Sequence, residues 1–186
     1  YPYSTEQELA SIKSMCTEGI INGIISEGIA TLCNKGTYYG SLTSFLPGAG
    51  YLFKTDGTGY EFSYPEPIQT DLPRGIDARL SRDLPSGYNY NQSYAQAFYF
   101  IEKIPQIKED QWLLAYNGDV LVGARQWGGA NTDIPTMGNV GTNSTTGYME
   151  EGMIPKFKIL RENKLIDLEA YVQIPGWHQN SLFLIY

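Results

Sequence analysis

The chain has 186 residues, of which 42% are hydrophobic and 18% are charged, and its formal net charge is −7. This length allows one large or two small domains and is enough to bury a core. The acidic balance argues against a nucleic-acid partner, because no basic stripe is present to neutralise phosphates, and it equally disfavours an anionic membrane surface. No apolar run of the sequence approaches the roughly 18 residues that span a bilayer.

The composition indicates an extracellular β protein more than a cytosolic enzyme, since 20 glycines and 15 tyrosines accompany few charges. Residues 1–4 have neither the basic start nor the apolar core of a signal peptide, so a secreted chain would already have lost its signal. The two cysteines, Cys16 and Cys33, are too few for a structural zinc site. We expect them to form one disulfide that closes a loop of about 17 residues and contributes roughly 3 kcal/mol. Two buried free thiols are the alternative.

The first predicted element is a short helix over 5–17. Thr5 and Glu8 have the spacing of a capping box, and Ser4 with Gln7 offers the alternative register. Gly19 ends the helix. The residues expected on its apolar face recur at helical spacing: Leu9, Ile12, Lys13 and Cys16.

Short β-rich segments follow the helix and complete a predicted small β domain over 1–65. The hairpin signal Asp56-Gly57 lies between the last two of them, and a turn is expected at 34–36. The expected strands are 20–25 (strand or loop), 29–33, 38–42, 51–54 and 60–64. Residues 66–87 then change in composition, with prolines and mixed charges, and we interpret them as a linker or a long ordered crossover.

The remaining residues, 88–186, carry the densest β signals. Asn117-Gly118 lies between two apolar runs and is typical of a type I′ hairpin turn, whose two central positions need positive φ. The glycine-rich run 137–147 indicates a long loop. The expected strands are 95–103, 111–117, 119–127, 155–161, 165–174 and 181–186. The sequence therefore predicts a mainly β chain of two small antiparallel domains, the second a β-sandwich, with one short N-terminal helix.

Several motifs carry a family resemblance. In the second half they are QAFYFI at 96–101, Trp112, YNGD at 116–119, VGAR at 122–125, TDIPTMGN at 132–139, TGYM at 146–149 and PKFKI at 155–159. With these motifs the second half resembles a β-sandwich module of secreted and cell-surface proteins of the type IX secretion system. The first half, through YP at 1–2, GIA at 28–30, GSL at 40–42 and PGAGY at 47–51, is similar to a module that often neighbours it. The resemblance implies a fold and a non-enzymatic surface protein.

This chain departs from the family pattern at both ends. The related modules have an apolar strand before the Tyr-Pro segment, and they often continue into a C-terminal sorting domain. We therefore expect a processed piece of a longer precursor, or an assembly subunit that lacks one strand.

No constellation of catalytic residues stands out. His178 is the only histidine and no nucleophile motif accompanies it, so a hydrolase triad is disfavoured and His178 is expected on the surface. The carboxylate pairs Glu150-Glu151 and Glu109-Asp110 are expected in solvated turns, because a glycosidase needs two carboxylates across a cleft. We expect the protein not to be an enzyme and to need no cofactor.

Three other kinds of site have candidates. Loop oxygens suit calcium, and the candidate ligands are Asp119, Asp133 and Asn139, with Asn143 nearby. Asn91 and Asn143 begin Asn-x-Ser/Thr sequences and are candidate glycosylation acceptors. Aromatic residues that either stack on sugar rings or pack in cores are Tyr88, Tyr90, Tyr94, Trp127 and Trp177.

The expected mechanism is strand addition, in which a neighbouring subunit fills an open sheet edge. The candidate donor strand is the tail Leu182, Phe183, Leu184, Ile185 and Tyr186, which could instead be the last strand of its own sandwich; residues 1–3 are the second candidate. The sequence thus favours a secreted subunit of an extracellular filament, tube or surface assembly whose partners are copies of itself. The alternatives are a glycan- or protein-binding module cut from a larger adhesin or enzyme, and a viral structural protein.

Overall fold

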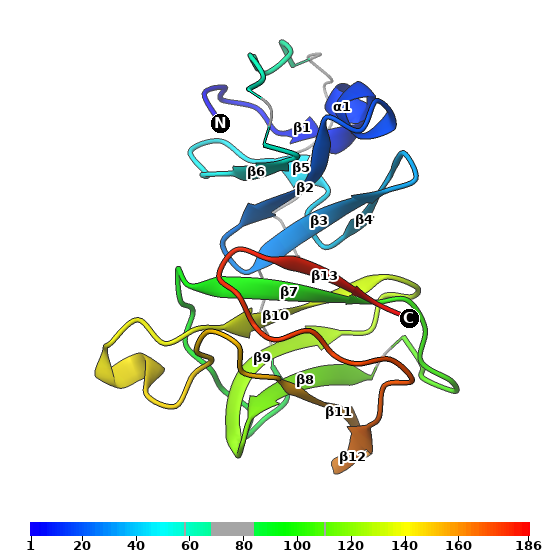
Figure 1. Ribbon diagram of the computed structural model, residues 1–186, viewed down its shortest axis with the longest axis vertical. Helices are drawn as coiled ribbons and strands as arrows, with labels where there is room; N and C mark the ends of the chain where they lie inside the picture. Colours follow the sequence, from blue (N-terminus) through cyan, green and yellow to red (C-terminus); the bar gives the residue numbers. More distant parts are fainter. Residues whose placement is uncertain (58, 68–83, 110) are drawn as a thin grey trace. The chain divides into compact units, whose positions relative to one another are not determined.

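The computed structural model describes residues 1–57, 59–67, 84–109 and 111–186. The fold is mainly β with antiparallel sheets and one short N-terminal α-helix, as the sequence predicts. The chain divides into two compact units, Tyr1–Asp83 and Leu84–Tyr186 (Figure 1). Most of the segment interpreted as a linker, 66–87, lies outside the described residues.

Unit 1 is built on a four-stranded antiparallel sheet with the order β4-β3-β2-β6. Its strands are β2 (Ile21–Ser26), β3 (Ile29–Asn34), β4 (Thr37–Gly40) and β6 (Leu52–Thr55). The short strands β1 (Gln7–Glu8) and β5 (Ser44–Phe45) form a separate pair. Lys35 and Gly36, with φ of 50° and 75°, join β3 to β4 and confirm the turn expected there.

The helix begins later than the predicted 5–17. A 3-10 helix, η1, spans Leu9–Ile12, and α1 spans Lys13–Thr17. Glu8 precedes η1 without a side-chain capping bond, so the predicted capping box is wrong. The physical reason is that residues 7 and 8 use their backbone to pair with β5. The predicted apolar face of the helix is largely right, because Leu9, Ile12 and Cys16 are buried. Lys13 is the one predicted member of this face that is exposed.

The strand predicted at 60–64 is absent, and the hairpin predicted at Asp56-Gly57 is wrong. β6 pairs with β2 instead. Phe62 and Tyr64 are held by ring packing, and their ring centroids lie 4.8 Å apart. The centroid of the Phe53 ring lies 4.8 Å from that of Phe62 and 6.2 Å from that of Tyr64. This segment therefore contributes aromatic side chains to the core of unit 1 without joining the sheet.

Unit 2 is a two-sheet sandwich. One sheet has the order β10-β7-β13 and the other β12-β11-β8-β9. The strands are β7 (Gln96–Ile101), β8 (Trp112–Asn117), β9 (Val120–Gln126), β10 (Thr132–Met137), β11 (Lys156–Arg161), β12 (Lys164–Leu168) and β13 (Leu182–Ile185). A 3-10 helix, η3 (Asn143–Thr145), lies in the predicted long loop. All strand pairs of the sandwich are antiparallel except β13 with β7.

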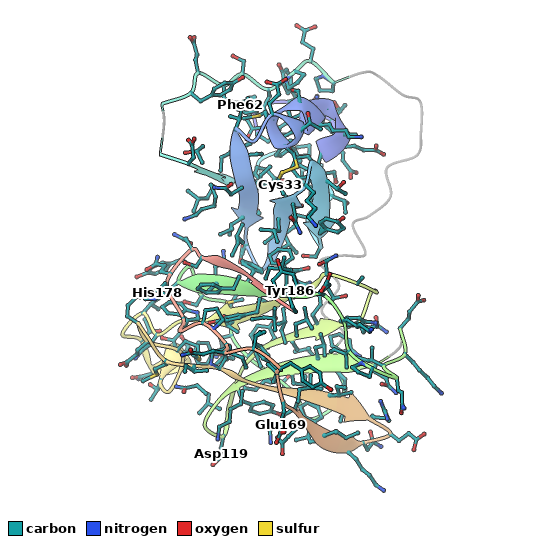
Figure 2. All side chains as sticks on the ribbon, turned by 45° about the vertical axis from the view of Figure 1, so that its right-hand side comes forward. Cys33, Phe62, Asp119, Glu169, His178 and Tyr186 are labelled. Atoms are coloured by element: carbon teal, nitrogen blue, oxygen red, sulfur yellow. A yellow bond between two sulfur atoms is a disulfide. The ribbon has the colours of Figure 1, made fainter. Side chains whose placement is uncertain are left out.

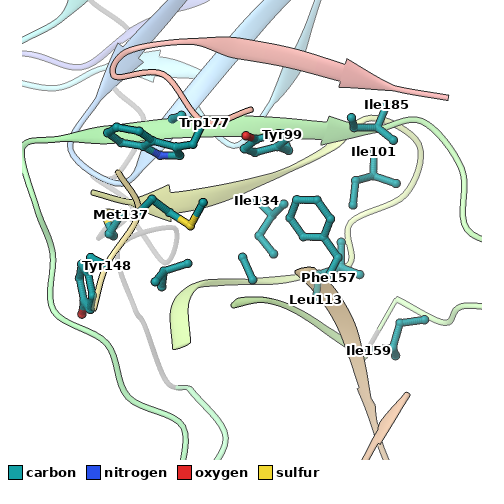
Figure 3. Close-up of a cluster of buried hydrophobic side chains, with 14 of the residues drawn as sticks. Tyr99, Ile101, Leu113, Ile134, Met137, Tyr148, Phe157, Ile159, Trp177 and Ile185 are labelled. Carbon is teal, nitrogen blue, oxygen red and sulfur yellow. The ribbon is translucent and has the colours of Figure 1, made fainter. Parts of the chain in front are cut away.

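One apolar core fills the space between the two sheets (Figure 3). Tyr99 and Ile134 come from the three-stranded sheet, and Leu113 and Phe157 from the four-stranded one. The rings of Tyr99 and Phe157 lie 5.3 Å apart. The Tyr99 hydroxyl donates to the Pro175 carbonyl at 3.0 Å, and burial raises its pKa. Both sheets thus depend on the same buried cluster.

β9 and β10 close one side of the sandwich. A Cβ at Gly123 would lie 1.6 Å from the Pro135 carbonyl oxygen, so only glycine fits there. Beside it, Arg125 Nε donates to the Asp133 carbonyl at 3.1 Å and Nη2 to the Asp133 carboxylate at 3.0 Å. β10 was not predicted as a strand. It tolerates Pro135 because it is an edge strand, where a missing N–H breaks no ladder.

The hairpin predicted at Asn117-Gly118 is confirmed, but its turn lies one residue later. Asn117 pairs with Val120, so the central residues are Gly118 and Asp119, and of these only Gly118 has positive φ, 59°. The Asn117 side chain donates instead to the Gly147 carbonyl at 3.0 Å.

The β11–β12 hairpin has the turn geometry that was expected at Asn117-Gly118. Its two-residue turn, Glu162-Asn163, has φ of 49° and 61°, as type I′ requires. β12 ends at Leu168, so the strand predicted over 165–174 is too long.

Candidate functional site at the C-terminal strand

The candidate donor strand is placed as the last strand of its own sandwich, which is one of the two alternatives that the sequence left open. β13 runs parallel to β7, from Leu182 opposite Phe98 to Ile185 opposite Ile101. The Phe98 and Glu102 amides donate to the carbonyls of Ser181 and Ile185, both at 2.9 Å. In the part of the chain that the structure describes, no strand pairs with the other side of β13. It is therefore an edge strand.

β13 contributes one of its faces to the core of unit 2. The Phe183 ring lies 4.8 Å from that of Tyr99, and Ile185 is buried in the same cluster. Tyr186, beyond the strand, is 63% exposed. The strand thus fills an apolar slot beside β7.

The segment before β13 is anchored at Trp177. Its indole Nε1 donates to the Thr136 carbonyl at 3.0 Å, and its backbone amide donates to the Met153 carbonyl at 2.7 Å. Gly138 makes room for the ring, because a Cβ at that position would lie 2.5 Å from it. The chain then turns at Asn180, where φ is 58°, and enters β13. A fixed anchor is therefore followed by a turn and an edge strand.

A hydrogen-bonded pair lies on the surface beside this anchor. His178 Nδ1 lies 2.5 Å from the Glu151 carboxylate, which also accepts from the Gln179 amide at 3.2 Å. The Gln179 amide and then His178 lower the pKa of Glu151. Both side chains are exposed, so the pair braces a turn in solvent.

The sandwich has an open side, opposite the side that β9 and β10 close. A cavity of about 70 Å³ lies there. Its apolar lining includes Ile101, Ile104, Phe157, Leu168, Ile174 and Ile185, and the exposed Tyr171 and Tyr186 lie at its rim. Sites for small organic ligands usually measure about 300–1,000 Å³. This cavity can therefore accept at most part of one side chain.

Two wider hollows lie among the described residues of unit 1. One, of about 580 Å³, lies between η1 and β4 and is lined by Glu8, Leu9 and Tyr38 among others. The second, of about 620 Å³, lies beside Cys16 and Cys33. Neither gathers a set of convergent catalytic groups.

The calcium candidates do not converge. Asp119 is exposed in its turn, whereas Asp133 is buried and bound by Arg125. Asn139 Oδ1 accepts from the Gly141 amide at 2.9 Å, and its Nδ2 donates to Glu150 at 3.2 Å. Asp133 and Asn139 are separated by most of β10, about 20 Å of extended chain. Within the described ranges, no three His, Cys, Asp or Glu side chains form a metal-binding group.

The expected disulfide between Cys16 and Cys33 is present, with a Cα–Cα distance of 5.6 Å, and it ties α1 to β3 (Figure 2). The glycosylation candidates Asn91 and Asn143 are both exposed, and Asn91 Nδ2 donates to the Ser144 carbonyl at 2.9 Å. Of the aromatic candidates only Tyr94 is exposed. Tyr88 and Tyr90 are half-buried, and Trp127 and Trp177 belong to the core. Trp177 is therefore an anchor and not a stacking surface.

Sequence reasoning missed the anchor and the open side. Gly138 is the sequence feature linked to the anchor. It could not be used in advance, because a glycine that makes room for a ring is recognised only once the ring has been placed. No helix of the described residues is long and apolar enough to cross a membrane. No protein-family model, curated protein or solved structure matches this chain.

Proposed function

We propose that the protein is a secreted structural subunit that joins copies of itself into a filament, tube or surface assembly by exchange of β13. In the assembly, β13 of one subunit leaves its own sandwich and fills the slot beside β7 of the next. Each subunit then keeps the same buried contacts, so exchange costs little beyond the rearranged turn.

The observation that carries this proposal is the order of features along the C-terminal segment: the Trp177 anchor comes first, then the turn at Asn180, then the edge strand β13. Trp177 holds the preceding segment, so the part that must move is short and starts near Asn180. β13 contributes four residues of parallel pairing, and such pairing is slightly less stable per residue than antiparallel pairing. The vacated slot exposes Tyr99 and the apolar core, which favours refilling by an identical strand.

The extracellular location rests on separate observations. The Cys16–Cys33 disulfide suits an oxidising compartment, and the composition is poor in charge. The resemblance to secreted surface modules points the same way.

Deletion of residues 181–186 tests the proposal. We expect the truncated chain to form no polymer by electron microscopy, because the exchanged strand is gone. Deletion of Tyr186 alone, which leaves β13 intact, is the matched control and is expected to assemble. An excess of a peptide with the sequence of 181–186 should also stop assembly of the full chain, by occupying the slot. Polymer of normal amount from the truncated chain would sink the proposal.

One observation favours the alternative of a binding module. Tyr171, 93% exposed, and Tyr186 flank the same apolar cavity on the open side. Exposed tyrosines can stack on the faces of sugar rings. Binding of glycans by the monomer on an array, lost on Tyr171→Ala, would support this function over assembly.

A further inference from the structure

The edge strand β12 carries exposed apolar residues on both faces. Ile166 lies opposite Ile159, on the face of the sheet that looks toward the core, and Leu165 lies on the other face. Their exposed fractions are 39% and 44%, although Ile159 is buried. The residues that cover this face of the sheet therefore bury Ile159 of β11 but leave Ile166 of β12 exposed. An edge strand with exposed apolar residues is a place where a further strand can pair.

The register of β12 is also fixed by its pairing with β11. All five of its residues pair with β11, and the type I′ turn at Glu162-Asn163 fixes its register. A salt bridge of 2.8 Å between Lys158 and Asp167 joins the two strands on the outer face. Among the described strands, none pairs with the second edge of β12. The N–H and C=O groups on that edge are thus presented by a hairpin of defined register.

The sequence of β12 is complementary to itself. The strand Lys-Leu-Ile-Asp-Leu holds one positive and one negative residue, so it has no net charge in a chain whose net charge is −7. Two copies can therefore approach here without the repulsion that their overall charge creates elsewhere.

We propose that β12 pairs antiparallel with β12 of a second copy of this chain, about a two-fold axis at Ile166. In this register Ile166 opposes the same residue of the second copy, Leu165 opposes Asp167, and Lys164 opposes Leu168. All five strand residues gain a partner and no like charges face each other. The result is one continuous eight-stranded sheet made from two four-stranded ones.

Neighbouring registers are worse. Centring the pair on Asp167 sets two carboxylates opposite each other, which is unfavourable. Centring it on Leu165 places Asp167 and Leu168 opposite the turn residues Asn163 and Glu162, outside the strand. Five residues a side bury less than the roughly 1,200–2,000 Å² of a standard interface. The contact is therefore weak alone and strengthens when subunits are already linked. It does not depend on β13, so it stands or falls separately from strand exchange.

Cysteine crosslinking of the full chain tests the register. The two native cysteines are joined to each other, so Ile166→Cys adds a single free thiol. Directly opposed antiparallel residues have Cα atoms about 4.5–5.5 Å apart, within the range of a disulfide. Leu165→Cys on the same strand places its two cysteines diagonally, with Cα atoms about 7–8 Å apart. Val172→Cys, of similar exposure but outside β12, reports random collision.

We expect the Ile166→Cys chain to form a covalent dimer under mild oxidation at least several-fold faster than either control, with the 166–166 linkage found by mass spectrometry. Ile166→Lys, made without any added cysteine, should lower the dimer fraction in sedimentation velocity at high concentration. Equal crosslinking rates for all three cysteine variants, or a partner other than this chain at β12, would overturn the proposal.

Discussion

Trp177 is the residue that fixes the C-terminal segment of unit 2. Its indole N–H satisfies the Thr136 carbonyl inside the core, and its backbone bonds to the loop at Met153. The ring fits because Gly138 has no side chain. The neighbouring Glu151–His178 hydrogen bond lies in solvent and adds little, since water screens and competes with exposed polar contacts. Packing and hydrogen bonds between neutral groups, and not charge, therefore hold the segment from which β13 departs.

Gly138→Ala tests this role at the scale of one residue. The new Cβ would lie 2.5 Å from the Trp177 ring and 3.0 Å from the Ala95 Cβ, so the ring must shift. We expect a loss of about 1–3 kcal/mol in the unfolding free energy, the usual cost of overpacking. Gly128→Ala is the matched control, because its nearest neighbour would be 3.8 Å away. Equal stability of the two variants in denaturant titrations would contradict the anchor role.

At the scale of elements, the sequence predicted the strands whose apolar residues are regular and uninterrupted. β7, β8, β9 and β11 were found because aromatic and branched residues run between clear turns. β10 was missed because Pro135 argues against a strand unless its edge position is known. The segment 60–64 was wrongly predicted, since Phe62 and Tyr64 alternate like strand residues but bury by ring packing. Local pattern cannot distinguish these cases, because edge position and ring packing are set by distant residues.

The turns and the candidate site show the same limit. Asn117-Gly118 predicted a hairpin correctly, yet the turn lies one residue later, after a register shift between Ala115 and Tyr116. The disulfide was predictable from the presence of two cysteines. The tail was predictable as a strand, but its parallel pairing with β7 and the cavity beside it depend on the whole sandwich.

The joint between β4 and the helical segment gives a pH-dependent prediction. The Tyr38 hydroxyl donates to the Ile12 carbonyl at 3.0 Å, and burial raises the pKa of Tyr38 to about 12. The unfolded chain loses this proton near its ordinary pKa of about 10, while the folded chain keeps it. The contribution to stability is therefore complete below pH about 10 and is lost as the pH rises to about 12.

Tyr38→Phe should accordingly flatten the decline of unfolding free energy between pH 10 and 12, measured by denaturant titration at several pH values. Tyr60→Phe, at an exposed position, is the control and should leave the decline unchanged. If the unfolding free energy of the Tyr38→Phe chain falls with pH as steeply as that of the wild type, Tyr38 does not keep its proton in the folded state.

At the scale of the whole molecule, the two proposed contacts of unit 2 would together build a polymer. Exchange of β13 would join subunits head to tail, which produces an open chain when the rotation does not close. Pairing of β12 would relate subunits by a two-fold axis and so connect two such chains. Unit 1 carries the disulfide and its own aromatic core.

The most direct measurement of the central claim is electron microscopy of a chain whose β13 cannot leave. Ile101 and Ile185 are Cα partners in the parallel pair, so Ile101→Cys with Ile185→Cys joins β13 to β7 within one subunit. The strand stays in place, and the two bonded cysteines replace two buried members of the core of unit 2. The same variant after reduction has the same core substitutions and is therefore the matched control for their effect. The wild type under the same oxidising and reducing conditions controls for the native disulfide.

We predict that the locked chain stays monomeric while oxidised and forms polymer once the lock is reduced, as the wild type does in both conditions. Polymer of normal length from the oxidised, locked chain would contradict strand exchange.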